Sequence, residues 1–403
     1  MAPPHLRTSS PTRGIDASFL GLAFSLLPGG SEQVEKYLGI AGVGVYLVVG
    51  ITILLASREY LVPGFVNRVT ERAGWILALS TLGCLLFLFL LIYPVADAGV
   101  VGGGSDSDDA LNLGARALLN HQYPYGIHTE SGAPVTYLPG SLFLAIPFVI
   151  LGNAAYQNWF WLALFLLTMR FYLKGVRQAL LLFWMTFLCS RILQLLVTGG
   201  ELLASSIYIV LFVLFAMRSF LAEHRRWLRW VAAVLLGIGL SSRANYLLLV
   251  PVIFSATLQK VGWKDTARYA AVTGGIFLAV TLPFWLHDPQ TFFMACLREQ
   301  NFAAIELNTI LPHADIALPL ASTVFAAGLS FRRLIDWDAD LLCNCALVQA
   351  FPVLAVVLLS SIDTGRLNLS YTGYGVHFLF FGALASWSGF IRSEQGGLKS
   401  HKG

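Results

Sequence analysis

Long apolar runs separated by short polar segments make up most of this chain. A helix needs roughly 20 apolar residues to cross a bilayer core about 30 Å thick. Runs that approach or exceed this length are Tyr37–Ser57, Trp75–Ala96, Tyr269–Leu286, Leu341–Ile362 and Leu367–Ile391. Shorter runs, bounded by charges, are Leu202–Met217, Trp230–Ser242, Ala244–Gln259 and Ile316–Phe331. Together with the helices of residues 136–198, these runs predict about ten to twelve membrane helices.

The segment 136–198 is harder to divide into helices. The apolar run Ser131–Met169 is about twice the length of one span, and residues 152–158 in its middle are turn-like. The run Ala179–Thr198 is a further candidate. Asp109 and Glu201 can lie on the same face of the membrane only if the chain crosses it an even number of times between them. The pattern, however, contains three candidate crossings. One candidate must be re-entrant, broken or interfacial, or Ala179–Thr198 forms two half-helices hinged near Ser190-Arg191.

Composition supports a membrane protein. Of the 403 residues, 57% are hydrophobic and only 12% are charged, which is about half the charged fraction of a typical soluble protein. So few charges exclude a water-soluble domain of this size, and the same numbers exclude a disordered chain. Continuous apolar runs also differ from the alternating strands of a transmembrane β-barrel. The expected fold class is all-α: a polytopic membrane helix bundle with an amphipathic helix in its first large external loop.

Three parts are expected along the chain. Residues 1–36 form a polar N-terminal tail whose short apolar stretch predicts an interfacial helix or a short first span. Residues 37–391 form the integral membrane domain, and its acidic external loop covers residues 94–136. Residues 392–403 form a short basic tail on the cytoplasmic side.

Charged residues divide between two sets of loops. One set is basic and contains Arg58, Arg68, Arg72, Arg218, Arg225, Arg226, Arg229, Lys260, Lys264, Arg268, Arg332, Arg333 and Arg392. The opposite set is mainly acidic and contains Asp106, Asp108, Asp109, Glu130, Glu201, Asp288, Glu299, Glu306 and Asp363. The positive-inside rule places the basic loops in the cytoplasm. We therefore expect a multi-pass protein of the cell membrane with its chemically varied face on the periplasmic or extracellular side, and no nucleic-acid partner despite the net charge of +4.

The longest segment expected outside the membrane carries a group of acidic residues. Gly102-Gly103-Gly104 allows a sharp exit from the bilayer, and Asp106, Asp108 and Asp109 follow at a predicted helix start, where the helix dipole favours anions. The apolar face of that helix is Leu111, Ala115, Leu118 and Leu119, and its polar face is Asp109, Asn112 and Arg116. These spacings predict a short amphipathic helix on the outer membrane surface.

The three aspartates have two interpretations. They are either the solvated, capped start of a helix, or a site for a base or a cation, because like charges near a membrane raise one another's pKa and are retained where chemistry needs them. The spacing of Asp106 and Asp108 also suits a hard divalent cation, which prefers carboxylate oxygens. A divalent cation is therefore the one cofactor that the residues leave open.

Six motifs follow one another in a recognisable order. They are Asp106-Ser107-Asp108-Asp109, Gly114-Ala115-Arg116-Ala117-Leu118-Leu119, Tyr123-Pro124-Tyr125, Tyr137-Leu138-Pro139, Thr198-Gly199-Gly200-Glu201 and Ser241-Ser242-Arg243-Ala244-Asn245. In this order they resemble the GT-C superfamily of membrane glycosyltransferases, and in particular its bacterial mannosyl- and arabinosyltransferases. The resemblance covers roughly residues 75–260.

The resemblance implies a transferase that uses a polyprenyl-phosphate-linked sugar donor and a glycan, lipid or protein acceptor, with inversion at the anomeric carbon. Asp108 or Asp109 is the hypothesised general base, and Asp106 assists it or binds a cation. Arg243 is the candidate for the donor phosphate, because its planar fork donates two parallel hydrogen bonds. Arg366 is a second candidate for the phosphate.

Four further residues are candidates for substrate contacts. Tyr125 and Tyr137 either anchor helices at the membrane interface or stack on a sugar. Glu201 either compensates a helix dipole, holds an arginine or binds a sugar hydroxyl. Glu299 lies in the loop of residues 287–313, which is long enough to cover a site.

Other functions are compatible with a bundle of apolar helices. A transporter or a flippase for lipid-linked sugars also uses intramembrane charges and broken helices, and a catalytically inactive scaffold protein is a third possibility. Polar residues gathered at one face favour interfacial chemistry over passage through the membrane. Geometry separates these classes: in a transferase, Asp108 or Asp109 should face Arg243 across a cavity open to the outer leaflet.

Overall fold

The structure is a computed structural model, and it describes residues 16–98, 106–129, 132–221, 227–299, 311 and 313–392. Within these ranges the chain is helical apart from turns and one isolated β-bridge between His128 and Pro134. The α-helices of the first half are α1 (Ala17–Leu26), α2 (Pro28–Ala56), α3 (Val62–Arg68), α4 (Glu71–Asp97), α5 (Asp106–Leu119), α6 (Pro139–Ile150), α7 (Tyr156–Tyr172), α8 (Val176–Thr186) and α9 (Ser190–Val197). Those of the second half are α10 (Glu201–Leu221), α11 (Trp227–Leu240), α12 (Leu249–Val261), α13 (Trp263–His287), α14 (Pro289–Phe293), α16 (Ala314–Ser330), α17 (Trp337–Thr364) and α18 (Val376–Arg392). Short 3-10 or π segments are η1 (Ser57–Leu61), η2 (Pro124–Gly126), η3 (Ala244–Leu248), η4 (Met294–Glu299) and η5 (Thr372–Gly375).

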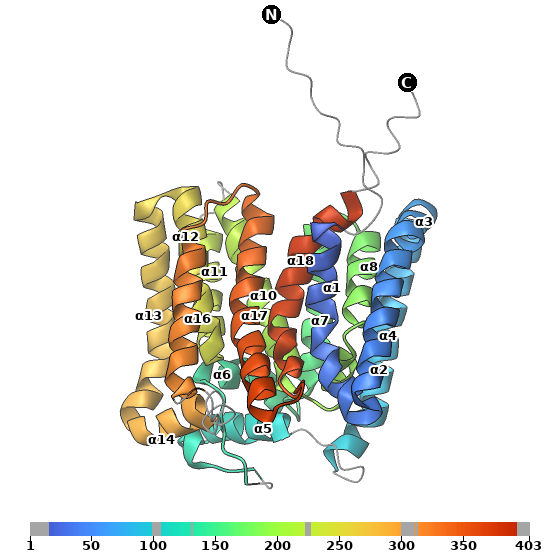
Figure 1. Cartoon of the computed structure of the whole chain (residues 1–403). Coiled ribbons are helices and arrows are strands. Elements are labelled where there is room, and N and C mark those ends of the chain that lie inside the picture. Colours follow the sequence, from blue (N-terminus) through green and yellow to red (C-terminus); the bar gives the residue numbers. More distant parts are fainter. Residues whose placement is uncertain are drawn as a thin grey trace, which may run out of the picture.

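Long apolar helices stand side by side in one bundle (Figure 1). In the described part of the chain, seven helices are long and apolar enough to cross a membrane, or eight if α8 and α9 form one span. The expected all-α, multi-pass architecture is therefore present at this level. The count is lower than the predicted ten to twelve, and one reason is that the apolar helices α1, α6, α11 and α16 are each shorter than a full span.

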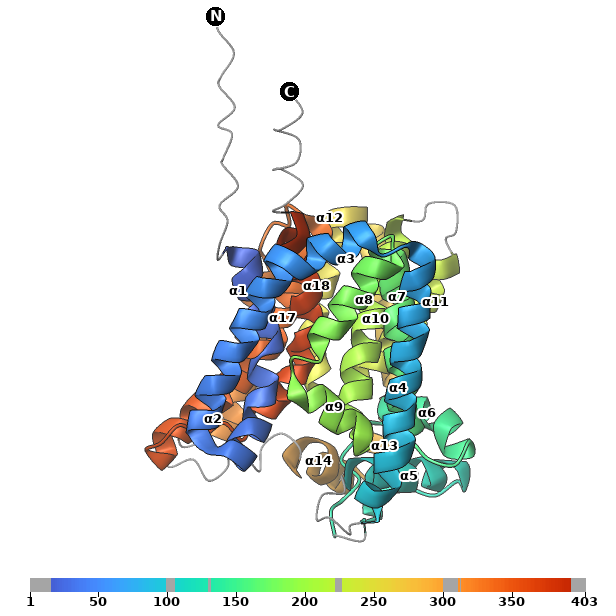
Figure 2. The same cartoon turned by 90° about the vertical axis from the view of Figure 1, so that its right-hand side faces the viewer.

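The segment between α5 and α10 has a broken helix. Helices α8 and α9 meet at an angle of 87°, as in the alternative that divides Ala179–Thr198 into two half-helices. Figure 1 shows α6 confined to the end of the bundle that carries α5, whereas α7 runs toward the other end, and Figure 2 shows α8 and α9 returning from there. Because only α7 and the α8–α9 pair connect the two ends, α5 and the start of α10 lie at the same end.

The bundle begins earlier than the expected boundary at residue 37. Helix α1 packs along α18, and Phe19, Leu22 and Leu26 are buried. Helix α2 then turns sharply at Gly39, whose φ of 66° is in the left-handed region that glycine tolerates. The apolar stretch near the N-terminus thus packs within the bundle.

The two ends of the bundle differ in charge. Helix α3, the end of α12 and the end of α18 lie at one end, and α5 and α14 lie at the other (Figure 1). We call the first the basic end and the second the acidic end. According to the helix bounds, the described residues of the predicted basic set lie at the first end, and those of the predicted acidic set lie at the second. Helix α10 is almost wholly buried at the centre, and it starts with Glu201 at the acidic end and carries Arg218 toward the basic end.

Candidate functional site

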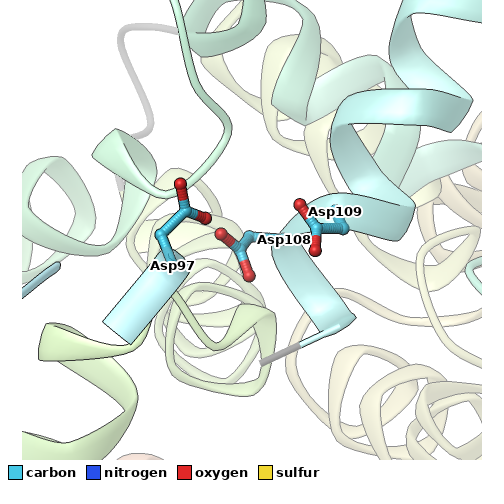
Figure 3. A group of neighbouring side chains, drawn as sticks. All are labelled: Asp97, Asp108 and Asp109. Atoms are coloured by element: carbon cyan, nitrogen blue, oxygen red, sulfur yellow. The ribbon is translucent and has the colours of Figure 1, made fainter. Parts of the chain in front are cut away.

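Three carboxylates meet at the acidic end of the bundle. Asp97 ends α4, and Asp108 and Asp109 lie in the first turn of α5. One carboxylate oxygen from each lies within 4.8 Å of those of the other two. Figure 3 shows Asp108 between its two neighbours. Two helices that are consecutive in the chain thus bring three carboxyl groups together, and we call this group the acidic cluster.

Asp108 is the buried member of the acidic cluster. Its side chain is 1% exposed, and its Oδ2 accepts a hydrogen bond of 2.5 Å from the hydroxyl of Tyr93. Burial raises the pKa of Asp108 from its usual 3.8 to about 7, and the neighbouring charges of Asp109 and Asp97 act in the same direction, against the hydrogen bond from Tyr93. Near neutral pH, this carboxyl is therefore present in both protonation states.

Helix α5 is amphipathic, as predicted, but its buried face is wider than the apolar pattern indicates. Leu111 and Ala115 are buried, and Leu119 is exposed. Asn112, assigned from the sequence to the polar face, is buried instead. Its Nδ2 donates to Asn153 Oδ1 at 3.1 Å, and its Oδ1 accepts from the backbone N–H of Ala154 at 2.8 Å. These bonds attach α5 to the turn between α6 and α7.

The turn between α9 and α10 packs against the acidic cluster. Gly199 has a φ of 76°, and a Cβ atom there would lie 2.8 Å from both Asp108 Oδ2 and Tyr93 Cε2. Asn158 Nδ2 donates at 3.0 Å to the carbonyl oxygens of Leu195 and Gly200, which fixes both ends of the turn. Glycine at position 199 therefore satisfies two requirements at once: a left-handed backbone and close approach to a carboxylate.

A buried ion pair lies next to this turn. Arg243, which precedes η3, is 6% exposed, and Glu201 at the start of α10 is 1% exposed. Arg243 Nε donates to Glu201 Oε2 at 2.9 Å, and Nη2 donates to the same oxygen. Burial alone would lower the pKa of Arg243, but the charge of Glu201 outweighs it and holds that pKa above its usual value. Arg243 therefore stays ionised.

Two residues surround the ion pair. Ser141 at the start of α6 donates to Glu201 Oε1 at 3.3 Å. The ring of Tyr137 lies 5.5 Å from the guanidinium carbon of Arg243, within the range of a cation–π contact. Arg243 Nη1 donates to none of the residues that the structure describes, so this nitrogen is the donor left for a ligand.

One hydrogen bond connects the ion pair to α5. The backbone N–H of Glu201 donates to Ser107 Oγ at 3.1 Å, and Ser107 directly precedes Asp108. The acidic cluster and Arg243, far apart in the sequence, are therefore neighbours at the acidic end. Arg243 makes its ion pair with Glu201, which is the arginine-holding alternative considered for Glu201.

The other predicted site residues lie in different surroundings. Asp106 is exposed at the first position of α5, and the acidic cluster contains Asp97 in its place. Tyr125 is 2% exposed and packs edge-on against Phe292, with ring centroids 5.1 Å apart. Arg366 is exposed in the loop after α17. Glu299 ends η4, and its side chain lies outside the described residues.

Two residues of this site were missed from the sequence: Asp97, a member of the acidic cluster, and Tyr93, which donates a hydrogen bond to Asp108. Both lie near the end of α4: Tyr93 directly precedes the predicted acidic loop of residues 94–136, and Asp97 lies within the first residues of that loop. Their spacing of four places them on one helix face, which was a usable signal. What the sequence did not reveal was that α4 ends beside the first turn of α5.

The carboxylate oxygens of the acidic cluster form a ligand set that fits a hard divalent cation. Oxygen ligands of Ca²⁺ or Mg²⁺ lie about 2.0–2.6 Å from the ion, so oxygens up to about 4.8 Å apart can share one. The residues that would hold it are Asp97, Asp108 and Asp109. Asp106, predicted from the sequence to share a cation with Asp108, is exposed and lies outside this group.

Comparison with known proteins does not place the chain in a family. No family model, no curated protein and no solved structure matches it. At the level the fold defines, the protein is all-helical in its described part, with several helices apolar and long enough to cross a bilayer.

Proposed function

We propose that this protein transfers a sugar from a polyprenyl-phosphate donor to an acceptor hydroxyl on the non-cytoplasmic side of the cell membrane. The observation that carries the proposal is the meeting of acidic and cationic groups at one end of the bundle. The bond between Ser107 and Glu201 joins the start of α5, which bears Asp108 and Asp109, to the residue that holds Arg243. A sugar-phosphate donor needs both kinds of group, a base and a cation.

The two aspartates of α5 have different tasks in this proposal. Asp109 is exposed, whereas Asp108 is buried, so Asp109 is the carboxylate that can touch an acceptor hydroxyl and act as the base. Asp108 is a positioning residue that shares the local negative charge and, through Tyr93, fixes the start of α5.

The reaction is a direct displacement. The acceptor oxygen attacks the anomeric carbon while its proton passes to Asp109, and the bond between that carbon and the phosphate oxygen breaks. The electron pair of that bond leaves with the lipid phosphate, whose charge Arg243 stabilises through Nη1. Attack opposite the leaving group inverts the anomeric carbon. A divalent cation on the acidic cluster would supply further stabilisation of negative charge when bound.

The test is sugar transfer in membranes that contain the protein, with a panel of radiolabelled polyprenyl-phosphate sugars as donors. Asp109→Asn is expected to lower the transfer rate by at least about 100-fold, the size of a general-base contribution. Arg243→Ala should raise the KM for the donor. Asp106→Asn is the matched control, because it removes an exposed carboxylate of the same helix outside the acidic cluster, and it should transfer at close to the wild-type rate.

Folding must be checked in parallel, by size-exclusion chromatography of each detergent-purified variant. Undiminished transfer by correctly folded Asp109→Asn would remove the proposed base. Transfer by no donor of the panel, with wild-type protein of correct fold, would count against the proposed function as a whole.

A further inference from the structure

A second feature of the molecule lies away from the acidic end. A cavity of about 340 Å³ is formed between α7, α10 and α11. Apolar and aromatic side chains make up most of its wall, among them Trp161, Leu164, Phe212, Phe215 and Leu235. The cavity opens beside exposed apolar residues, since Phe171 on its rim and Leu167 nearby are 66% and 43% exposed. In a bilayer, this opening faces hydrocarbon, so the ligand that enters it is apolar where it is bound.

We call this open cavity the groove, and its size and shape fit a single hydrocarbon chain. On α7, its lining extends from Trp161 to Tyr172, which is about 16 Å along the helix axis. Half of a bilayer core about 30 Å thick is about 15 Å, so the groove matches the depth of one leaflet. A second helix, with a diameter of about 10 Å, is too large for the cavity.

One end of the groove is charged. Arg218 lines it toward the basic end of the bundle, is 48% exposed, and has its guanidinium carbon 4.7 Å from the ring centre of Tyr172. Arg170 directly precedes the lining residue Phe171, and its guanidinium carbon lies 5.0 Å from that ring centre, which adds a second positive charge beside the groove. Asp338 lies 3.4 Å from Arg218, but an ion pair this exposed is weak. A phosphate can therefore bind the remaining donors of the guanidinium.

We infer that the groove between α7, α10 and α11 binds one acyl chain of a phospholipid, with the lipid phosphate at Arg218. The apolar wall takes the chain, the length matches one leaflet, and the arginine lies where the headgroup of that leaflet begins. Basic residues at the ends of grooves between membrane helices bind lipid headgroups by the same chemistry.

This site is separate from the proposed sugar-transfer site. Along α10, Arg218 and Glu201 are about 25 Å apart by helix geometry, and Glu201 holds Arg243 at the acidic end. A donor with its phosphate at Arg243 therefore cannot have that phosphate at Arg218. The bound lipid belongs to the leaflet at the basic end, and the inference holds whether or not the protein transfers sugars.

The test is photocrosslinking of the detergent-purified protein with a phosphatidylglycerol that carries a diazirine in one acyl chain. Mass spectrometry of the peptides should find crosslinks on α7 between Trp161 and Tyr172 and on α10 between Leu211 and Arg218. Unlabelled phosphatidylglycerol should compete, and diacylglycerol with the same chains, which lacks the phosphate, should compete about tenfold less well because it loses a charge-assisted hydrogen bond.

Three variants refine the result. Arg218→Gln should reduce crosslinking of these peptides about tenfold, Leu164→Trp should abolish it by filling the groove, and Arg268→Gln, which removes an exposed charge at the same end, should not change it. Equal labelling of all lipid-facing helices would overturn the inference. So would equal competition by diacylglycerol and phosphatidylglycerol, a measurement that needs only the wild-type protein.

Discussion

Asp108 and Arg243 are both buried charged groups, but their surroundings act on them in opposite ways. Arg243 has a full counter-charge in Glu201, so burial leaves it ionised. Among the residues that the structure describes, Asp108 has the hydroxyl of Tyr93 as its one side-chain donor, and it lies beside two further carboxylates. A buried charge without a counter-ion is costly, and for this reason the charge of Asp108, unlike that of Arg243, depends on pH.

The first prediction concerns stability against pH. The folded-state pKa of Asp108 is about 7, above the usual 3.8, so between these values the folded protein holds a proton that the unfolded chain has released. The free energy of unfolding should therefore fall as the pH rises from about 4 to about 7, by at most roughly 4 kcal/mol for this group. Thermal unfolding across this range should show a flatter profile for Asp108→Asn. A profile as steep as wild type would show that Asp108 is not the titrating group.

The second prediction concerns the buried ion pair. Arg243→Met leaves Glu201 buried without its partner and should destabilise the fold by about 3–5 kcal/mol. Adding Glu201→Met should restore most of that loss, because the double variant buries no charge. The matched control is Arg268→Met, since the exposed pair of Arg268 with Asp265 is expected to contribute less than about 1 kcal/mol. Chemical denaturation in detergent measures all three, and equal losses in the single and double variants would contradict the argument.

At the scale of the element, the turn between α9 and α10 is the most constrained part of the site. Gly199→Ala should both strain a left-handed backbone, at about 1–3 kcal/mol, and push the Asp108 carboxylate from its place. Gly262→Ala is the matched control, because Gly262 has a similar φ of 79° but open space around its Cβ position. We expect the Asp108 pKa, measured by infrared titration, to move in Gly199→Ala only. A shift of the same size in both variants would mean that backbone strain, and not the close contact, is responsible.

The helices also differ in how much of their structure can be predicted from their own sequence. The amphipathic spacing of α5 was predicted, and the break between α8 and α9 was one of the alternatives that the sequence left open, because periodicity and an arginine within an apolar run are local features. The burial of Asn112 was not visible, because its partners, Asn153 and the backbone of Ala154, belong to a later turn. A polar side chain can face a protein interior whenever distant backbone groups satisfy it.

At the scale of the whole molecule, the separation of charge predicts the orientation in the membrane. The basic end should face the cytoplasm. In a background without native cysteines, Arg116→Cys in α5 should therefore react with a membrane-impermeant maleimide on intact cells, and Arg268→Cys in α13 only after permeabilisation. Both positions are exposed, so accessibility is matched. The reverse labelling pattern would place the proposed site in the cytoplasm and remove polyprenyl-linked donors of the outer leaflet as its substrates.

The sequence by itself determined the helical class, the segregation of charge between the two ends and the presence of an acidic helix start. Each of these depends on residue type and local spacing, which chain geometry converts directly into structure. Only the tertiary structure decided that Asp97 joins Asp108 and Asp109, that Glu201 pairs with Arg243, and that α1 belongs to the bundle. The physical reason is that these contacts come from helix ends and faces meeting in space, and their partners are selected by packing and by the need to compensate buried charge, neither of which leaves a local pattern in the chain.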